Sequence, residues 1–152
     1  MRFTFASSVV LAIVVGLVAA PIPKAKPPKD EEAIQGTWQI DKFDLGQGVP
    51  VPPLDFTQMR FTFKSGGKLT MSMGDMPLKE GEYKLDPAAK VKEIDMTESG
   101  RVAPGIYELE GDALKICIAE GKNAVRPTEM KPDGKRIAVI TLKRVKEEKK
   151  EK

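Results

Sequence analysis

The sequence contains no histidine, a single cysteine and few aromatic residues, and each shortage excludes a kind of site. Without imidazole there is no histidine metal ligand, no Ser-His-Asp or Cys-His nucleophile system and no ordinary general base near neutral pH. Cys117, being alone, excludes an intramolecular disulfide and a Cys-x-x-Cys zinc or redox site. We therefore predict a protein that is not an enzyme, with no catalytic residues, no cofactor and no conventional metal site.

The first 20 residues have the pattern of a secretory signal peptide. One positive charge at Arg2 precedes an apolar run from Phe3 to Ala20, which ends in small residues. We expect cleavage near Ala20 and an exported protein, located in the periplasm, in the cell envelope or outside the cell. The alternative is an uncleaved anchor, because this run is just long enough to cross a membrane. In that case the signal segment is the protein's only contact with a membrane.

Residues 21–32 are predicted to be a linker rich in proline and lysine, because proline cannot pair in a sheet and favours extended chain. Around its end, residues 30–35 are expected to form one helical turn, with Asp30 as the N-cap and Ile34 packed against the domain as a plug. A folded domain is predicted for residues 33–145 and a charged tail for residues 146–152.

From Gly36 onward, apolar residues recur with a period of two, which is typical of antiparallel strands with one buried face. Eight such runs are present, from Gly36–Phe43 to Arg136–Val145. Turn signals separate several of them, namely Ser65-Gly66-Gly67, Asp86-Pro87, Gly111-Asp112 and Pro132-Asp133-Gly134. Consecutive short hairpins favour a meander, and closing it removes the exposed edges. The predicted fold is all-β, a small antiparallel up-and-down barrel of about eight strands.

Five segments carry a resemblance to a known family: Gln35-Gly36-Thr37-Trp38, Gly105–Leu109, Gly111–Cys117, Arg126-Pro127-Thr128-Glu129 and Leu142-Lys143-Arg144. In this order they resemble a planctomycete-type family of lipocalin-like domains of unknown function, often found in exported proteins. The Gly-x-Trp start of the first strand is shared with lipocalin-like barrels in general. The resemblance implies a barrel fold over about residues 33–145, and it implies no catalytic residue.

In lipocalin-like barrels the tryptophan of Gly-x-Trp closes one end of the core, so the resemblance assigns a structural role to Gly36 and Trp38. A basic side chain near the end of the last strand is its partner there. Because Ile140, Leu142 and Arg144 share one face by alternation, Arg144 is expected to lie across the indole as a cation–π partner. The alternative role for Trp38 is ligand stacking.

Large inward-facing residues define the predicted interior of the barrel. An eight-stranded barrel is just wide enough to be filled by side chains or to hold one small ligand. Two functions therefore stay open: binding of a small apolar ligand, and a structural or protein-interaction module with a filled core. A cavity of roughly 300 Å³ or more favours the first. The predicted lining residues are Phe56, Phe61, Phe63, Met71, Met73, Tyr83 and Tyr107.

The loop from Asp44 to Phe56 is rich in glycine and proline and carries several apolar residues. It is expected to lie across the mouth of the barrel, either as a movable lid or as a fixed plug.

Met71, Met73 and Met76 form a Met-x-Met-x-x-Met pattern that suits soft Cu(I), so copper binding is a third candidate function. The alternative is that Met71 and Met73 fill gaps in the core.

Two charged or reactive features, Cys117 and Arg126, have alternative interpretations. Cys117 is either an accessible thiol beside Lys115 or a small residue buried under the linker or a neighbouring loop. Arg126 either pairs with a carboxylate on a neighbouring strand and pins its own loop, or binds an anion. Removing the mixed-charge tail 143–152 and Arg2 from the formal net charge of +3 leaves −1 for residues 3–142. We therefore expect no nucleic-acid partner, and no motif indicates an oligomeric state.

Overall fold

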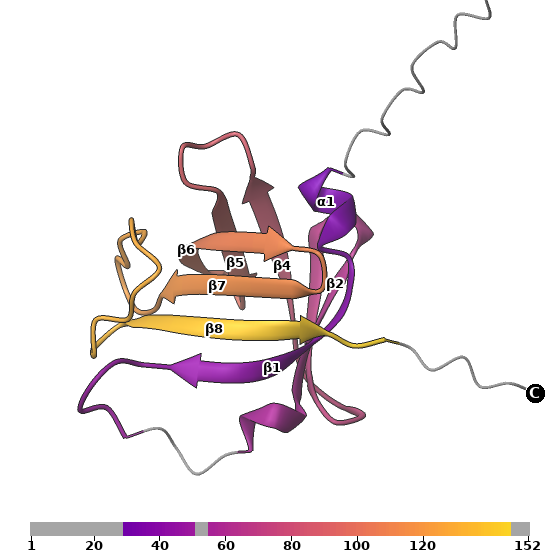
Figure 1. The fold of residues 1–152 in the computed structure, drawn as a ribbon, viewed down its shortest axis with the longest axis horizontal. Helices are drawn as coiled ribbons and strands as arrows, with labels where there is room; N and C mark the ends of the chain where they lie inside the picture. The colour runs from indigo at the N-terminus through magenta and orange to yellow at the C-terminus, as the bar shows by residue number, and fades with distance from the viewer. Residues whose placement is uncertain (1–28, 51–54, 147–152) are drawn as a thin grey trace, which may run out of the picture.

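Eight antiparallel strands close into one barrel in which each strand pairs with the next and β8 pairs back with β1 (Figure 1). The computed structural model describes residues 29–50 and 55–146, so the predicted signal peptide, most of the linker and most of the tail lie outside the described residues. The strands are β1 (Gly36–Asp44), β2 (Met59–Lys64), β3 (Lys68–Met73), β4 (Met76–Asp86), β5 (Glu93–Glu98), β6 (Arg101–Glu110), β7 (Ala113–Ala119) and β8 (Ile137–Arg144). The predicted all-β up-and-down barrel is confirmed.

Short helical turns complete the fold: α1 (Asp30–Ala33), and the 3-10 turns η1 (Phe56–Gln58) and η2 (Ser65–Gly67). The two-residue turn at Gly111-Asp112 is confirmed, since β6 ends at Glu110 and β7 begins at Ala113. Two strands begin earlier than alternation predicts, β4 at Met76 and β6 at Arg101. Tight turns extend these hairpins: Ser99 and Gly100 both adopt positive φ angles, of 48° and 76°, as in the turns whose twist matches paired strands.

A β-bulge in β1 changes which residues face the interior. Ile40 lies opposite Leu142, whereas Lys42 lies opposite Thr141, so Asp41 is an extra residue on β1. Before the bulge the inward residues are Trp38 and Ile40, and after it the inward residue is Phe43. Strict alternation would instead direct the Lys42 ammonium group into the core, where burial of an unpaired charge is costly.

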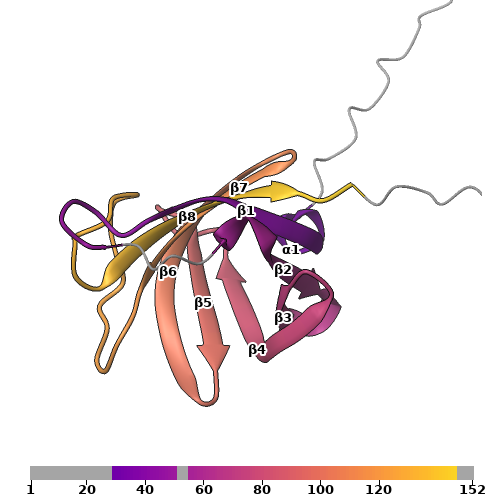
Figure 2. The same cartoon turned by 90° about the horizontal axis from the view of Figure 1, so that it is seen from below.

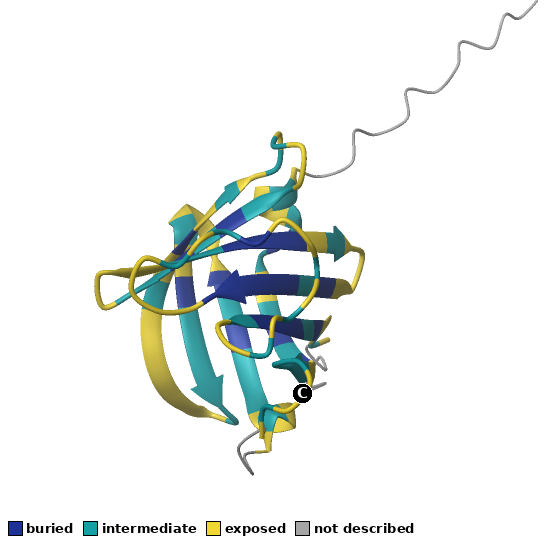
Figure 3. Cartoon of the chain, turned by 90° about the vertical axis from the view of Figure 1, so that its left-hand side faces the viewer, coloured by how far each residue is buried: buried dark blue, intermediate teal, exposed yellow. Residues whose placement is uncertain are grey.

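The densest part of the core lies at the barrel end where β1 begins and β8 ends. Trp38, Leu114 and Leu142 are completely buried, and Phe63 meets Tyr83 edge to face with ring centroids 5.0 Å apart. Figure 3 shows that the buried segments lie within the strands, whereas exposed residues occur in the connecting loops and along parts of some strands. Among the described residues, no helix has the length and apolar character needed to cross a membrane.

A second, smaller cluster lies on the outer face of the barrel. Ile106, Cys117 and Val139 pack there beneath the loop that connects β7 to β8, with Met130 of that loop against them. Cys117 Sγ lies 3.5 Å from the carbonyl oxygen of Glu129 in this loop. Burial raises the pKa of the Cys117 thiol, so the thiolate is disfavoured. The expectation that Cys117 is buried under a neighbouring loop is confirmed.

Candidate functional site

One end of the barrel is closed by Trp38 and Arg144. The Arg144 guanidinium carbon lies 4.2 Å from the centroid of the Trp38 ring, which confirms the cation–π pairing predicted from alternation. Arg144 Nη1 and Nη2 also donate to the carbonyl oxygens of Gln35 and Ala33, at 2.7 and 2.5 Å. The Trp38 indole N–H donates to the carbonyl oxygen of Ile34 at 2.7 Å. The indole N–H of Trp38 therefore has a hydrogen-bond acceptor and its ring has a cation–π partner, as expected for a structural role.

Gly36 is required at this end for two reasons. Its φ of 117° is a conformation that residues with a Cβ rarely adopt. In addition, a Cβ on Gly36 would lie 3.0 Å from Arg144 Nη1, directly in the path of the guanidinium group. The absence of a side chain at Gly36 therefore lets Arg144 cover the indole.

The helical turn α1 lies at the same end of the barrel, beside the start of β1 (Figure 2). Ile34 is completely buried, as expected for a plug. The prediction that Asp30 caps the helix is wrong, because the N-cap position is Lys29 and no side chain caps the turn. Asp30 instead turns toward the barrel, where its carboxylate accepts hydrogen bonds from Tyr107 Oη at 2.6 Å and Lys92 Nζ at 2.8 Å.

These contacts determine the protonation states of Asp30 and Tyr107. Burial opposes ionisation of Asp30, but the hydrogen bonds from Lys92 and Tyr107 outweigh it and lower the pKa of the carboxyl group. Burial, followed by the hydrogen bond to Asp30, raises the pKa of Tyr107 far above its usual range. At neutral pH the site is therefore a charged Asp30–Lys92 pair joined to a neutral phenol.

The opposite end of the barrel is hollow. A cavity of about 1170 Å³ opens there, at the end where β1, β3, β5 and β7 finish. Its wall is apolar and includes Ile40, Phe43, Phe61, Met71, Met96 and Ile140. This volume is well above the roughly 300 Å³ that favours ligand binding over a filled core.

A small residue on β6 leaves part of this space empty. Ala103 faces the interior opposite Met96, and its methyl group does not fill that level. Gly81 on β4 has a different cause, because a Cβ there would clash with the carbonyl oxygen of Thr97. On the other side of the cavity, Phe56 stacks on Phe43 with ring centroids 4.8 Å apart. The described part of the predicted lid is thus packed on the rim, and the rest of that loop, residues 51–54, lies outside the described residues.

Charged side chains border the cavity only where strands end. Lys79 is near the start of β4, Glu98 and Arg101 flank the turn between β5 and β6, and Glu120 and Lys122 follow β7. The interior surface therefore changes from apolar to charged along the barrel axis. Such a gradient suits a ligand with an apolar body and a polar end.

The predicted lining residues divide between the two ends. Phe56, Phe61 and Met71 line the cavity. Met73 lies at the end of β3 and does not border it. The remaining three lie in the closed half, namely Phe63, Tyr83 and Tyr107.

Those three lie in the barrel interior as predicted but do not border this cavity, and the reason is their level along the barrel. Alternation correctly assigns them to the inner face, since all three are buried. However, Tyr83 Oη donates to the carbonyl oxygen of Lys64 beside the turn η2, and Tyr107 Oη reaches Asp30 of α1. A period of two defines the face of a strand but not the distance of a residue from either end.

Several lining residues were not predicted. Ile40, Ile140 and Met96 follow strand alternation, and that signal could have identified them. Phe43 could not be identified in this way, because the bulge at Asp41 shifts the inward face by one residue.

The methionines predicted as a copper site are only partly brought together. Met71 lines the cavity, whereas Met76 is 61% exposed at the start of β4. Strand pairing places Met73 between Met59 and Met76 instead. Within residues 29–50 and 55–146, no group of three or more histidine, cysteine, aspartate or glutamate residues is arranged to hold a metal. Copper binding stays a prediction.

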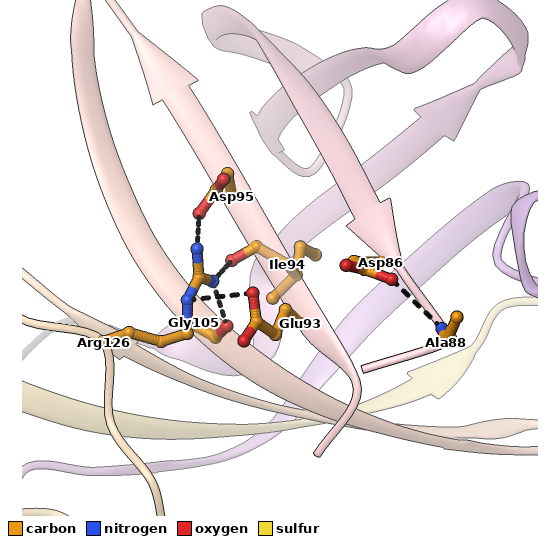
Figure 4. Close-up of polar contacts among 7 residues, drawn as sticks. All are labelled: Asp86, Ala88, Glu93, Ile94, Asp95, Gly105 and Arg126. Carbon is orange, nitrogen blue, oxygen red and sulfur yellow. Dashed lines mark hydrogen bonds and ion pairs between the residues drawn. The ribbon is translucent and has the colours of Figure 1, made fainter. Parts of the chain in front are cut away.

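Arg126 pins the loop between β7 and β8 to the outside of the barrel (Figure 4). Its Nη2 lies 2.8 Å from Asp95 Oδ1 and its Nε 3.2 Å from Glu93 Oε2. Its Nη1 donates to the carbonyl oxygens of Gly105 at 2.7 Å and Ile94 at 3.3 Å. The predicted pairing with a neighbouring strand is confirmed. Because two carboxylates and two carbonyls already occupy the guanidinium, little capacity remains for a separate anion.

No protein-family model, curated protein or solved structure matches this sequence. The resemblance to lipocalin-like domains therefore stays a prediction, and the site has to be interpreted from its own geometry.

Proposed function

We propose that the protein binds a small apolar ligand in the hollow end of its barrel and catalyses no reaction. The observation that carries this proposal is the cavity of about 1170 Å³, with its apolar wall and its single charged border. Ligand sites in proteins are concave, mostly apolar and a few hundred to about 1,000 Å³ in volume. Export of the protein, predicted from residues 1–20, and its membership in the lipocalin-like family form part of the same proposal.

The energetic argument favours a ligand over an empty cavity. Each methylene group transferred from water to an apolar wall contributes about 0.8 kcal/mol. The wall needs no rearrangement to accept it, because the closed end holds the strands in place through Trp38 and Arg144. A preformed cavity of this kind avoids the ordering cost that weakens binding to flexible sites.

A fluorescence titration with N-phenyl-1-naphthylamine, a neutral apolar dye, tests the proposal. We expect saturable enhancement of dye fluorescence with the wild-type protein. Ala103→Phe places a ring inside the cavity and should weaken dye binding about tenfold or more, because the ring occupies ligand volume. Ala113→Phe is the matched control, since Ala113 is exposed at the start of β7 away from the cavity.

Far-UV circular dichroism and thermal unfolding of both variants establish that each is folded. Equal dye affinity in the wild type and Ala103→Phe would contradict the proposal, since the dye would then bind elsewhere. No saturable binding to the wild type would favour the alternative, a structural or protein-interaction module. The filled half of the barrel around Trp38 and Leu142 supports that alternative, because it needs no ligand for stability.

A further inference from the structure

We infer that the ligand is a single-chain amphiphile with an anionic head group, and that Arg101 and Lys122 bind this head group at the rim of the cavity. The inference rests on the proposed function and specifies the class of ligand. It depends on the distribution of charge around the mouth, whereas the proposed function depends on the cavity alone.

The shape of the site orients such a ligand. The deep wall contains apolar side chains such as Phe61 and Ile140, and it offers no charged partner for a head group. The charged residues that border the cavity all lie at strand ends around its opening. A bound amphiphile therefore buries its chain in the barrel and leaves its head group among the rim residues, where water and charged side chains solvate it.

On one side of the rim, pairing leaves Arg101 free. Glu98 and Arg101 are directly opposite each other across the β5–β6 hairpin, so Glu98 is the natural partner of this arginine. The Glu98 carboxylate instead binds Lys79, with Nζ and Oε1 2.6 Å apart. Among the described residues, no carboxylate oxygen lies within 4.0 Å of the Arg101 guanidinium. The tight turn at Ser99 and Gly100 holds this arginine at the mouth.

Just after β7, the strand next to β6, Lys122 likewise has no carboxylate within 4.0 Å in the described part of the chain. One acidic residue, Glu120, opposes an anionic ligand here. Arg136 offsets that charge from the start of β8, since its Cδ and Nε lie 3.9 Å from the position of a Cβ on Gly121. At the mouth itself, Arg101 and Lys122 then face one carboxylate, and the local potential favours an anion.

The planar guanidinium of Arg101 suits this role. It can donate two parallel hydrogen bonds to a carboxylate or a phosphate, and Lys122 adds a point charge after the neighbouring strand β7. Both residues are exposed, so solvent and salt screen the interaction. The head group is therefore expected to set selectivity, while the buried chain supplies most of the affinity.

Displacement of N-phenyl-1-naphthylamine by four twelve-carbon amphiphiles, each below its micelle concentration at pH 8, tests the inference. Dodecanoate and dodecyl phosphate are the anions, dodecan-1-ol is the neutral analogue and dodecyltrimethylammonium is the cation. We expect both anions to bind more tightly than the cation by about tenfold, the sum of two modest screened charge contacts. The two anions also distinguish a carboxylate head group from a phosphate head group.

The double variant Arg101→Gln/Lys122→Gln should weaken binding of the anions about fivefold and leave dodecan-1-ol within twofold, because only the charge contacts are lost. Glu120→Gln should strengthen binding of the anions. The double variant Lys84→Gln/Lys90→Gln is the matched control, because it removes the same net charge from exposed positions away from the cavity.

The outcomes separate this inference from the proposed function. Unchanged anion binding in Arg101→Gln/Lys122→Gln overturns the inference and leaves the proposed function intact. The inference is also overturned when the cation binds as tightly as the anions. Failure of all four amphiphiles and of the dye to bind the wild type overturns both.

Discussion

The two ends of this barrel use the same strands for opposite purposes. At the closed end, large side chains such as Trp38 and Leu142 fill the interior completely, and the polar groups of Arg144 and Tyr107 find partners. At the open end, the small residue Ala103 occupies an inward position and borders a cavity. The packed core and the cavity are thereby separated along the barrel axis, so a change at one end should leave the other end largely intact.

The difference follows from side-chain size and not from strand geometry. Closely packed interiors gain dispersion contacts that an open apolar wall forfeits. Retaining exposed apolar surface at the open end lowers stability, and proteins keep such departures from optimal packing at functional sites. The contrast therefore supports the assignment of binding to the open end.

The largest effect is expected from truncating the centre of the closed end. Trp38→Ala removes the indole from a completely buried position and should lower the free energy of unfolding by about 3–5 kcal/mol. Met71→Ala at the open end should lower it by about 1 kcal/mol or less, because Met71 is only partly buried and already borders empty space. Urea unfolding followed by circular dichroism measures both.

Trp38→Phe covers the case in which Trp38→Ala does not fold. It keeps an aromatic ring but loses the hydrogen bond to Ile34, so it should unfold at a urea concentration between those of the wild type and Trp38→Ala. Equal losses for Trp38→Ala and Met71→Ala would contradict the division of the barrel into two ends.

The second prediction concerns the side chain that covers the indole. Arg144→Met keeps an apolar stem but leaves the carbonyl groups of Gln35 and Ala33 without their donor, so we expect a loss of about 2 kcal/mol. Tryptophan emission should shift to longer wavelength as water reaches Trp38. Lys143→Met is the control, because Lys143 forms only an exposed pair with Asp41 and should change stability by less than about 1 kcal/mol.

An unchanged emission spectrum together with wild-type stability in Arg144→Met would contradict the closing role of this residue. Such a result would also remove one of the two reasons for the glycine at position 36, whose missing side chain makes room for the guanidinium group.

How far the sequence predicts these two ends differs between them. At the closed end, the resemblance to lipocalin-like barrels implies a basic partner for Trp38 near the end of the last strand, and alternation identifies this partner as Arg144. The bulge does not disturb this pair, because Trp38 comes before it on β1 and lies directly opposite Arg144 in the register between β1 and β8. Turn chemistry likewise predicts the hairpin at Gly111-Asp112, because its residue types are local signals.

The open end is harder to predict because it depends on non-local facts. Phe43 becomes a lining residue only through the bulge at Asp41, a one-residue change of register that no local pattern announces. By alternation Tyr107 faces the interior, but it lies at the closed end of the barrel, where its hydroxyl group donates a hydrogen bond to Asp30. Arg101 has no carboxylate partner because Glu98 pairs with Lys79, and this choice between two neighbouring cations is visible only in the three-dimensional structure.

The third prediction uses pH to probe the closed end. The pKa of Asp30 is lowered below its ordinary value of 3.8, so its contribution to stability is present above that value and is lost as pH falls through the folded-state pKa. The pKa of Tyr107 is raised above its ordinary value of 10.0, so its contribution is present below pH 10 and is lost as pH rises further. Tyr107→Phe should lower stability by about 1–2 kcal/mol at pH 7.

The difference in unfolding free energy between the wild type and Tyr107→Phe should shrink below about pH 4 and above about pH 10. At acid pH the gain is lost as Asp30 takes up a proton, and above pH 10 the phenol of Tyr107 ionises in the unfolded chain, which favours unfolding of the wild type only. Urea unfolding at pH 3, 7 and 10.5 measures it. Tyr83→Phe is the control: its hydroxyl group donates to a carbonyl oxygen, so its effect should not change on the acid side. A Tyr107→Phe difference that is constant over all three pH values would contradict the assigned contact.

The smallest effect on stability is expected at the loop that carries part of the open rim. Arg126→Ala removes the ion pairs to Glu93 and Asp95 and the two backbone contacts, yet these groups are partly exposed and should cost about 1 kcal/mol or less. The loop should nevertheless open more often, because Arg126 joins it to β5 and β6. Reaction of Cys117 with a thiol reagent should then accelerate severalfold, since this loop covers its sulfur atom. Lys135→Ala, an exposed change in the same loop, should leave the rate unchanged. A wild-type rate in Arg126→Ala would show that Met130 and its apolar contacts, and not the guanidinium group, hold the loop and with it one side of the cavity mouth.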